Sequence, residues 1–233
     1  MVVITLGADL GVSDVVTINI VTTVNSLGNP LINNTASLTT SSTTNVISND
    51  SDSVTIDIQA PTLNLPETGF APNVVSELPY QPLEKKYAAT DLVLEIPRLG
   101  VSIPIVGVPL TRDGWDVSWL GRQAGWLEGS AFPSWNGNSV LTGHVYDSNG
   151  LPGPFVNLNT LRYGDRIVVH AYGQQYIFEV RTNQIVGPND SSALKHEERS
   201  WLTLITCKEY DEKADTYRKR VVVRAVLVSV MWE

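Results

Sequence analysis

The sequence predicts an all-β protein, and three features of its 233 residues support that class. Stretches in which apolar and polar residues alternate recur along the chain, as in half-buried strands. These stretches are short, and residues typical of turns separate them. Signals for helices are few: residues 121–129 and 191–200 could each hold a turn or two. Many short strands joined by short turns favour a closed or nearly closed β-barrel.

Residues 1–60 form the first of three segments that differ in composition. They are rich in Thr, Ser, Val and Asn, and they contain alternating runs at residues 15–21 and 53–59. Three or four strands fit into this length, whereas a complete β-sandwich needs about seven. We therefore expect a partial β-sandwich here.

Residues 61–90 form a linker that contains five prolines. Proline at this density favours extended segments and prevents regular helix. Within the linker lies the sequence LPETG, at Leu65–Gly69. The strand pattern resumes at residue 91 and continues to residue 233.

The third segment, residues 91–233, predicts a second β-domain. Its first strands are expected to be broken at Pro97 and Pro104, and a hairpin is expected with a two-residue turn at Gly173 and Gln174. Further strands are predicted over the sequences NSVLTGHVY, WLTLITC and RKRVVVRAVLVSV.

The formal net charge of −8 argues against a nucleic-acid partner, because phosphate contacts need clustered Lys and Arg. Anionic lipid headgroups would also repel an acidic surface, so a small or peptidic partner is expected. Residues 1–16 lack the basic and apolar regions of a signal peptide, and the apolar run 221–232 is too short to span a bilayer. Either the protein is soluble as written, or the sequence begins inside a longer polypeptide.

Cys207 is the single cysteine, so neither an intramolecular disulfide nor a multi-cysteine zinc site is available to it. It is the last residue of a predicted strand, WLTLITC, and a polar loop follows, so the thiol would be accessible on a rigid scaffold. It is a small buried hydrophobe, a thiol without a role, or a nucleophile. A nucleophile needs an acid or base, and the histidines are His144, His170 and His196. We favour His144, at a strand end beside a turn, over a strand histidine and a surface histidine.

These residues carry a resemblance to a known family. LTGH, ending at His144, followed by TLITC, ending at Cys207, and by an arginine in the next strand is similar to the signature of sortases. The sequences LEIPRLGVSIPIVGV and GPFVNLNTLRYGDRIVVHAYGQQYIFEV also resemble sortases, and the resemblance covers about residues 91–230. It implies a closed β-barrel of about eight strands with short helices. Residues 1–58 resemble part of a repeated β-sandwich of bacterial surface proteins.

The resemblance also implies roles. Cys207 would attack a Thr-Gly peptide bond to give a thioacyl intermediate, and His144 would protonate the leaving amine. Arg220 would bind the oxyanion or the substrate backbone and is preferred over Arg218 and Arg224. Thr206 matches a position that lines the site. Residues 187–200 lack convincing calcium-ligand spacing, so no metal and no cofactor are expected.

The implied partners are LPxTG-like sorting signals and an amine from a cell-wall precursor or a pilin lysine, at the bacterial cell surface. The chain's own LPETG matches such a substrate, with cleavage expected between Thr68 and Gly69. No membrane-spanning helix and basic tail follow it, unlike in a wall-sorting signal. The motif is either a chance feature of the linker or a self-recognition motif, Leu65, Pro66, Glu67, Thr68 and Gly69, that docks in the site or is cleaved.

Two alternatives compete with this interpretation. Papain-like peptidases place their cysteine before the histidine and at a helix start, whereas here His144 precedes Cys207. An inactive sortase-like module of a surface adhesin is the non-enzymatic alternative, and residues 1–60 favour it.

Overall fold

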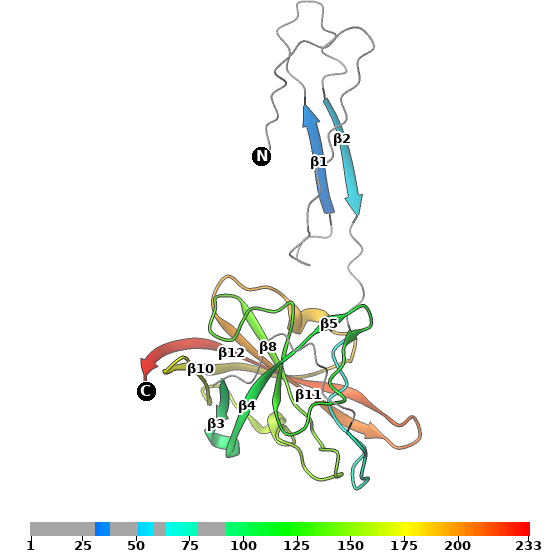
Figure 1. The fold of residues 1–233 in the computed structure, drawn as a ribbon, viewed down its shortest axis with the longest axis vertical. Coiled ribbons are helices and arrows are strands. Elements are labelled where there is room, and N and C mark those ends of the chain that lie inside the picture. The colour runs from blue at the N-terminus through cyan, green and yellow to red at the C-terminus, as the bar shows by residue number, and fades with distance from the viewer. Residues whose placement is uncertain (1–30, 38–50, 58–63, 79–91) are drawn as a thin grey trace, which may run out of the picture.

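A computed structural model of the chain describes residues 31–37, 51–57, 64–78 and 92–233 (Figure 1). Strands β1 (Leu31–Ser37) and β2 (Ser51–Asp57) pair antiparallel. The remainder of the partial β-sandwich expected in residues 1–60 lies outside the described residues. Among the helices that are described, none has the length and apolar character needed to cross a membrane.

The prediction of an all-β fold with a closed barrel is confirmed. Eight strands close the barrel in the order β10-β12-β11-β8-β7-β4-β3-β9. The barrel strands are β3 (Val93–Ile96), β4 (Val101–Val108), β7 (Ala124–Leu127), β8 (Asn138–Thr142), β9 (Arg166–Ala171), β10 (Gln174–Val186), β11 (Trp201–Asp211) and β12 (Thr216–Trp232). The remaining elements are the hairpin β5 (Leu110–Thr111) and β6 (Gly114–Trp115) and the 3-10 turns η2 (Pro97–Leu99), η3 (Leu158–Thr160) and η4 (Ser191–Leu194).

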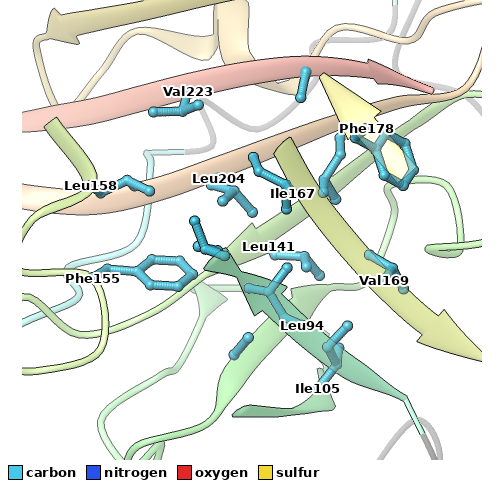
Figure 2. Packing of buried hydrophobic residues seen from close by; sticks show 14 of the residues in the cluster. Leu94, Ile105, Leu141, Phe155, Leu158, Ile167, Val169, Phe178, Leu204 and Val223 are labelled. Atoms are coloured by element: carbon cyan, nitrogen blue, oxygen red, sulfur yellow. The ribbon is translucent and has the colours of Figure 1, made fainter. Parts of the chain in front are cut away.

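The barrel interior is a packed core of aliphatic and aromatic side chains (Figure 2). Alternate residues of the strands point inward, so each strand contributes to the same cluster. Leu94, Leu141, Ile167, Leu204 and Val223 come from five different strands, and each is fully buried. Burying one such side chain contributes about 1.5–3 kcal/mol, so this core makes the barrel a firm support for a site at its edge.

The helix expected at residues 121–129 is a wrong prediction, because β7 occupies Ala124–Leu127. All four residues of β7 are buried between β4 and β8. A Cβ on Gly125 would meet Val108 Cγ2 at 2.7 Å, which shows how closely the strands pack there. Tertiary packing therefore decided the conformation. The second helical signal is borne out by the short turn η4 (Ser191–Leu194).

Two details of the strand predictions also change. The hairpin turns at Tyr172 and Gly173, one residue earlier than expected, and both have positive φ (55° and 70°), as a type I′ turn requires. Pro104 lies inside β4 and does not break it. The N–H of Ile105 bonds to Leu92 O in the chain before β3, so the nitrogen of Pro104 points to the other side. Pairing with β7 begins there only at Ile105, and no ladder bond is lost.

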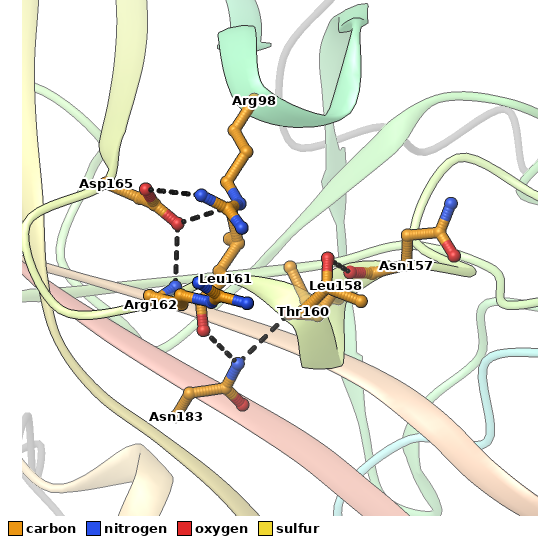
Figure 3. Close-up of polar contacts among 8 residues, drawn as sticks. All are labelled: Arg98, Asn157, Leu158, Thr160, Leu161, Arg162, Asp165 and Asn183. Atoms are coloured by element: carbon orange, nitrogen blue, oxygen red, sulfur yellow. Dashed lines mark hydrogen bonds and ion pairs between the residues drawn. The ribbon is translucent and has the colours of Figure 1, made fainter.

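Polar contacts fix the segment that leads from β8 to β9 (Figure 3). The Asn183 side chain donates to the carbonyls of Leu158 and Leu161, at 3.2 and 2.8 Å, and so ties η3 to β10. The carboxylate of Asp165 accepts from the Arg162 N–H at 2.7 Å and forms an ion pair with Arg98. These contacts hold the segment between β8 and β9 against β10 and η2.

Candidate active site

The antiparallel pair β11–β12 places Cys207 directly opposite Arg220. Strand β11 runs on through Cys207 to Asp211, so the prediction that the strand ends at the cysteine is wrong. The expected accessibility is wrong as well, since Cys207 has 0% exposure. Both differences come from contacts with other parts of the chain: β12 continues to pair beyond Cys207, and a segment distant in the sequence covers the thiol.

The parallel pairing of β8 with β11 brings His144 to the same level as Cys207. Thr142, the last residue of β8, lies opposite Ile205, and His144 and Cys207 each follow two residues later. The hydroxyl of Thr206 donates to Gly143 O at 2.7 Å. Thr206 therefore lies beside Cys207, and its hydroxyl positions the residue before His144.

The chain after β8 folds back, and its backbone forms hydrogen bonds with His144 and Val145. The N–H of Phe155 donates to His144 O at 3.1 Å, and the N–H of Gly153 donates to Val145 O at 2.9 Å. Gly143 packs flat on the Phe155 ring, where a Cβ would approach to 2.9 Å. His144 is buried, with its ring centroid 4.8 Å from that of Phe70.

Burial dominates the electrostatics of both groups. It raises the pKa of the Cys207 thiol to about 11, although the Arg220 guanidinium opposes this shift. Burial lowers the pKa of His144, against the smaller raising effects of the carbonyls of Leu120 and Val117. With the site covered, the thiol and the imidazole are therefore both neutral at neutral pH.

Arg220 is the arginine at the site. Its side chain is 3% exposed, and its Nε donates to Pro66 O at 3.1 Å. One terminal nitrogen donates to the carbonyls of Tyr217 and Lys219, which fixes the direction of the guanidinium. Arg218 is exposed and bonds to Asp211 at 2.9 Å.

The remaining candidates lie elsewhere. Arg224 pairs with Glu197 and lies over the Trp201 ring, at 4.7 Å from its centroid. His170 is bound between Glu95 and Glu233, where hydrogen bonds to these carboxylates raise its pKa against the opposing effect of burial. His196 is exposed.

The segment that covers the thiol is the chain's own LPETG, Leu65–Gly69. Figure 1 shows this part of the linker (cyan) beside the strands β11 and β12 (orange). The N–H of Thr68 donates to Cys207 Sγ at 3.0 Å, and the Val145 N–H donates to Thr68 O at 3.0 Å. On the N-terminal side, the N–H of Leu65 donates to Pro188 O at 2.9 Å. The motif is thus held through its backbone.

The degree of burial of each side chain in the motif depends on its position. Leu65 (2% exposed) packs into an apolar cluster that includes Val117, Leu120 and Ile205, and Pro66 and Thr68 are buried as well. Glu67, the variable letter of an LPxTG motif, points outward. Its carboxylate accepts from the Thr216 hydroxyl and from the N–H of Tyr217 at 3.0 and 3.2 Å.

Sequence reasoning missed two residues that contact the motif, Val145 and Tyr217. A Cβ on Gly69 would meet Val145 Cγ1 at 2.6 Å and Tyr217 Cε2 at 2.8 Å, so only glycine fits there. The Tyr217 hydroxyl also donates to Phe70 O at 2.8 Å. Val145 directly follows LTGH, so the sequence could have indicated that it lies at the site. The position of Tyr217 depends on the register of β11 and β12.

Comparisons with known proteins agree with this geometry. A family model described as the sortase domain matches residues 94–228. The putative sortase YwpE of Bacillus subtilis is 33% identical over 93 residues, which are 40% of this chain and 84% of that protein. Sortase C-1 of Actinomyces oris is similar with a TM-score of 0.50 and 29% identity, over 62% of this chain and 76% of that one.

A further solved structure, Clostridium perfringens sortase C with the C-terminal cell wall sorting motif, has a TM-score of 0.50 and 26% identity, over 62% of this chain and 74% of that one. The match of the family model spans more than half of the 233 residues. The chain therefore belongs to the sortase family of cysteine transpeptidases.

Proposed function

We propose that this protein cleaves LPxTG-like sorting signals between Thr and Gly and transfers the part up to Thr to an amine. Cys207 is the nucleophile, His144 the acid and base, and Arg220 the group that binds the substrate backbone. The observation that carries the proposal is the hydrogen bond from the Thr68 N–H of LPETG to Cys207 Sγ, at 3.0 Å. It comes with Arg220 bound to Pro66 O.

The chemistry follows from these positions. The thiol proton passes to His144 as Sγ bonds to the Thr carbonyl carbon, and the imidazolium then protonates the leaving glycine amine. The Val145 N–H, which binds Thr68 O, is placed to donate to the oxyanion. Arg220 holds the substrate backbone two residues upstream and brings a positive charge beside the thiolate. An amine then resolves the thioester and restores the thiol.

Three further proposals concern the domains of the chain, the acceptor amine and the location of the protein. Residues 1–60 are a partial surface-protein repeat, residues 61–90 a linker and residues 91–233 the catalytic domain. The acceptor is a cell-wall precursor amine or a pilin lysine, and the protein works at the bacterial cell surface. The match of the sortase family model to residues 94–228 supports the catalytic domain in this proposal.

A peptide assay tests the function. Leu65→Asp places a carboxylate in an apolar cluster, which is costly, so this open variant is expected to free the site for external peptide. The open variant should join the Leu-Pro-Glu-Thr part of a fluorogenic LPETG peptide to added triglycine, and Cys207→Ala should abolish this. Peptide cleavage indifferent to triglycine would indicate a hydrolase, and an inactive open variant would contradict the proposal.

A matched pair of arginine variants tests the assignment within the site. Arg220→Lys cannot reproduce the fixed set of backbone contacts, so in the open variant it should lower kcat/KM by about 10- to 150-fold, the cost of losing one hydrogen bond from a charged group. Arg218→Lys, at an exposed ion pair, should leave kcat/KM within about twofold. Equal effects of the two changes would contradict the role of Arg220.

A further inference from the structure

The linker motif occupies the site as a bound substrate would. Four of its backbone groups form hydrogen bonds with the rest of the protein, Leu65 N–H, Pro66 O, Thr68 N–H and Thr68 O, and the Glu67 carboxylate accepts two more from Thr216 and Tyr217. Leu65 fills the apolar cluster, while the Glu67 side chain faces outward. An external peptide with the same letters would make the same contacts through these five residues.

The bond between Thr68 and Gly69 lies where the chemistry takes place. Cys207 Sγ lies 3.0 Å from the nitrogen of Thr68, and Val145 N lies 3.0 Å from its carbonyl oxygen. The nucleophile and an oxyanion donor therefore contact the same residue. Gly69 packs against Val145 and Tyr217 without room for a Cβ.

We propose that the protein is its own substrate and that Cys207 transfers the chain up to Thr68 to an acceptor amine. This inference rests on the proposed function. A bond forms between Cys207 Sγ and the carbonyl carbon of Thr68, and the bond from that carbon to Gly69 N breaks. The proton of the thiol passes by way of His144 to the amine of Gly69. An acceptor amine then attacks the thioester, forms an amide with Thr68 and returns a proton to the thiol.

The leaving side of the motif stays bound to the barrel. The N–H of Phe70 donates to Tyr146 O, that of Asn73 to Gly150 O and that of Ser76 to Ser148 O, at 3.1, 2.9 and 2.6 Å. After cleavage, these contacts keep the new Gly69 amine beside the thioester at a high effective concentration. Religation therefore competes with transfer, and separated fragments accumulate only when an external amine is supplied.

The test is the intact mass of the purified full chain with and without triglycine. With triglycine, we expect a fragment of residues 1–68 extended by triglycine at Thr68 and a second fragment that begins at Gly69. Without an amine, the chain should remain mostly intact. The first-order rate constant should not change with protein concentration, because the motif is bound in its own chain.

Control variants separate this activity from contaminating proteases. Cys207→Ala should give no fragments, and Val75→Asp, at an exposed position of the same segment, should cleave as the wild type does. Fragments from Cys207→Ala would overturn the proposal. A first fragment that carries a free carboxylate in place of triglycine would overturn the transfer step. A rate constant that rises with protein concentration would overturn cleavage within one chain.

The assay with external peptide distinguishes failure of this inference from failure of the proposed function. If the open variant joins LPETG peptide to triglycine while the wild-type chain stays uncleaved under the same conditions, the linker is an inert plug. The self-transfer is then refuted, and the transpeptidase activity stands. If neither chain acts, both proposals fail.

Discussion

The hydroxyl of Thr206 donates a 2.7 Å hydrogen bond to the carbonyl of Gly143, between the strand that carries Cys207 and the residue before His144. Both residues lie where β11 runs beside the end of β8. The contact is buried, so water cannot replace it. The Thr206 hydroxyl therefore helps to fix the relative position of Cys207 and His144, together with the hydrogen bonds that the Gly143 N–H and the Thr142 hydroxyl donate to Ile205 O.

We expect Thr206→Val to lower the free energy of unfolding by about 1–3 kcal/mol, because it leaves the buried carbonyl of Gly143 without its donor. It should also lower kcat more than it changes KM, since His144 shifts while the substrate contacts remain. Thr206→Ser keeps the hydroxyl and should restore both. Urea unfolding and peptide kinetics in the open variant measure these effects, and equal kcat values for Val and Ser would contradict the positioning role.

The docked motif should control the reactivity of the thiol. The raised pKa of Cys207, about 11, leaves about one thiol in a thousand ionised at pH 8. Alkylation of the wild type by iodoacetamide should therefore be slow and should keep increasing above pH 9. In the open variant the thiol should approach its ordinary pKa of ~8.5, react at least tenfold faster at pH 8 and level off near pH 9.

Val75→Asp is the control for this measurement, because it adds the same charge to an exposed position of the segment. It should be alkylated at the wild-type rate. If the open variant and the wild type had the same pH profile, the motif would not be what covers the thiol.

The packing at Gly69 predicts a strict preference for glycine after the cleaved bond. Overpacking against Val145 and Tyr217 typically costs about 1–3 kcal/mol. The open variant should therefore process LPETA peptide with a kcat/KM about 5- to 150-fold below that for LPETG. Val145→Ala removes the contacting methyl group but keeps the N–H at Thr68, so it should narrow the difference. A difference unchanged by Val145→Ala would place the selectivity elsewhere.

Gly150 should govern how well an external amine competes with religation. It lies against the backbone of the leaving side, and a Cβ there would meet Val74 N at 2.4 Å. Gly150→Ala should loosen this contact and lower the triglycine concentration that gives half-maximal transfer. Gly173→Ala is the matched control, since Gly173 has the same φ of 70° and no atom within 4 Å of an added Cβ. Equal concentrations for the two variants would show that the leaving side does not restrain Gly69.

The sequence predicted the barrel because its strands carry regular alternation, and LTGH and TLITC drew attention to His144 and Cys207. Three features depended on tertiary structure. The strand at Ala124–Leu127 is set by its neighbours β4 and β8, the burial of Cys207 by a segment about 140 positions away, and the contact of Tyr217 by strand register. No local pattern encodes contacts of that range. The LPETG letters suggested self-recognition but could not supply its geometry.

The docked LPETG motif also protects the Cys207 thiol from oxidation. Oxidation of a cysteine to sulfenic acid and beyond requires a thiolate that the oxidant can reach. The docked motif removes access, since it contacts Sγ directly, and burial keeps the sulfur protonated. A chain that holds its own LPETG can therefore remain in peroxide for longer than an enzyme with an open site, and it becomes vulnerable only while the motif is away.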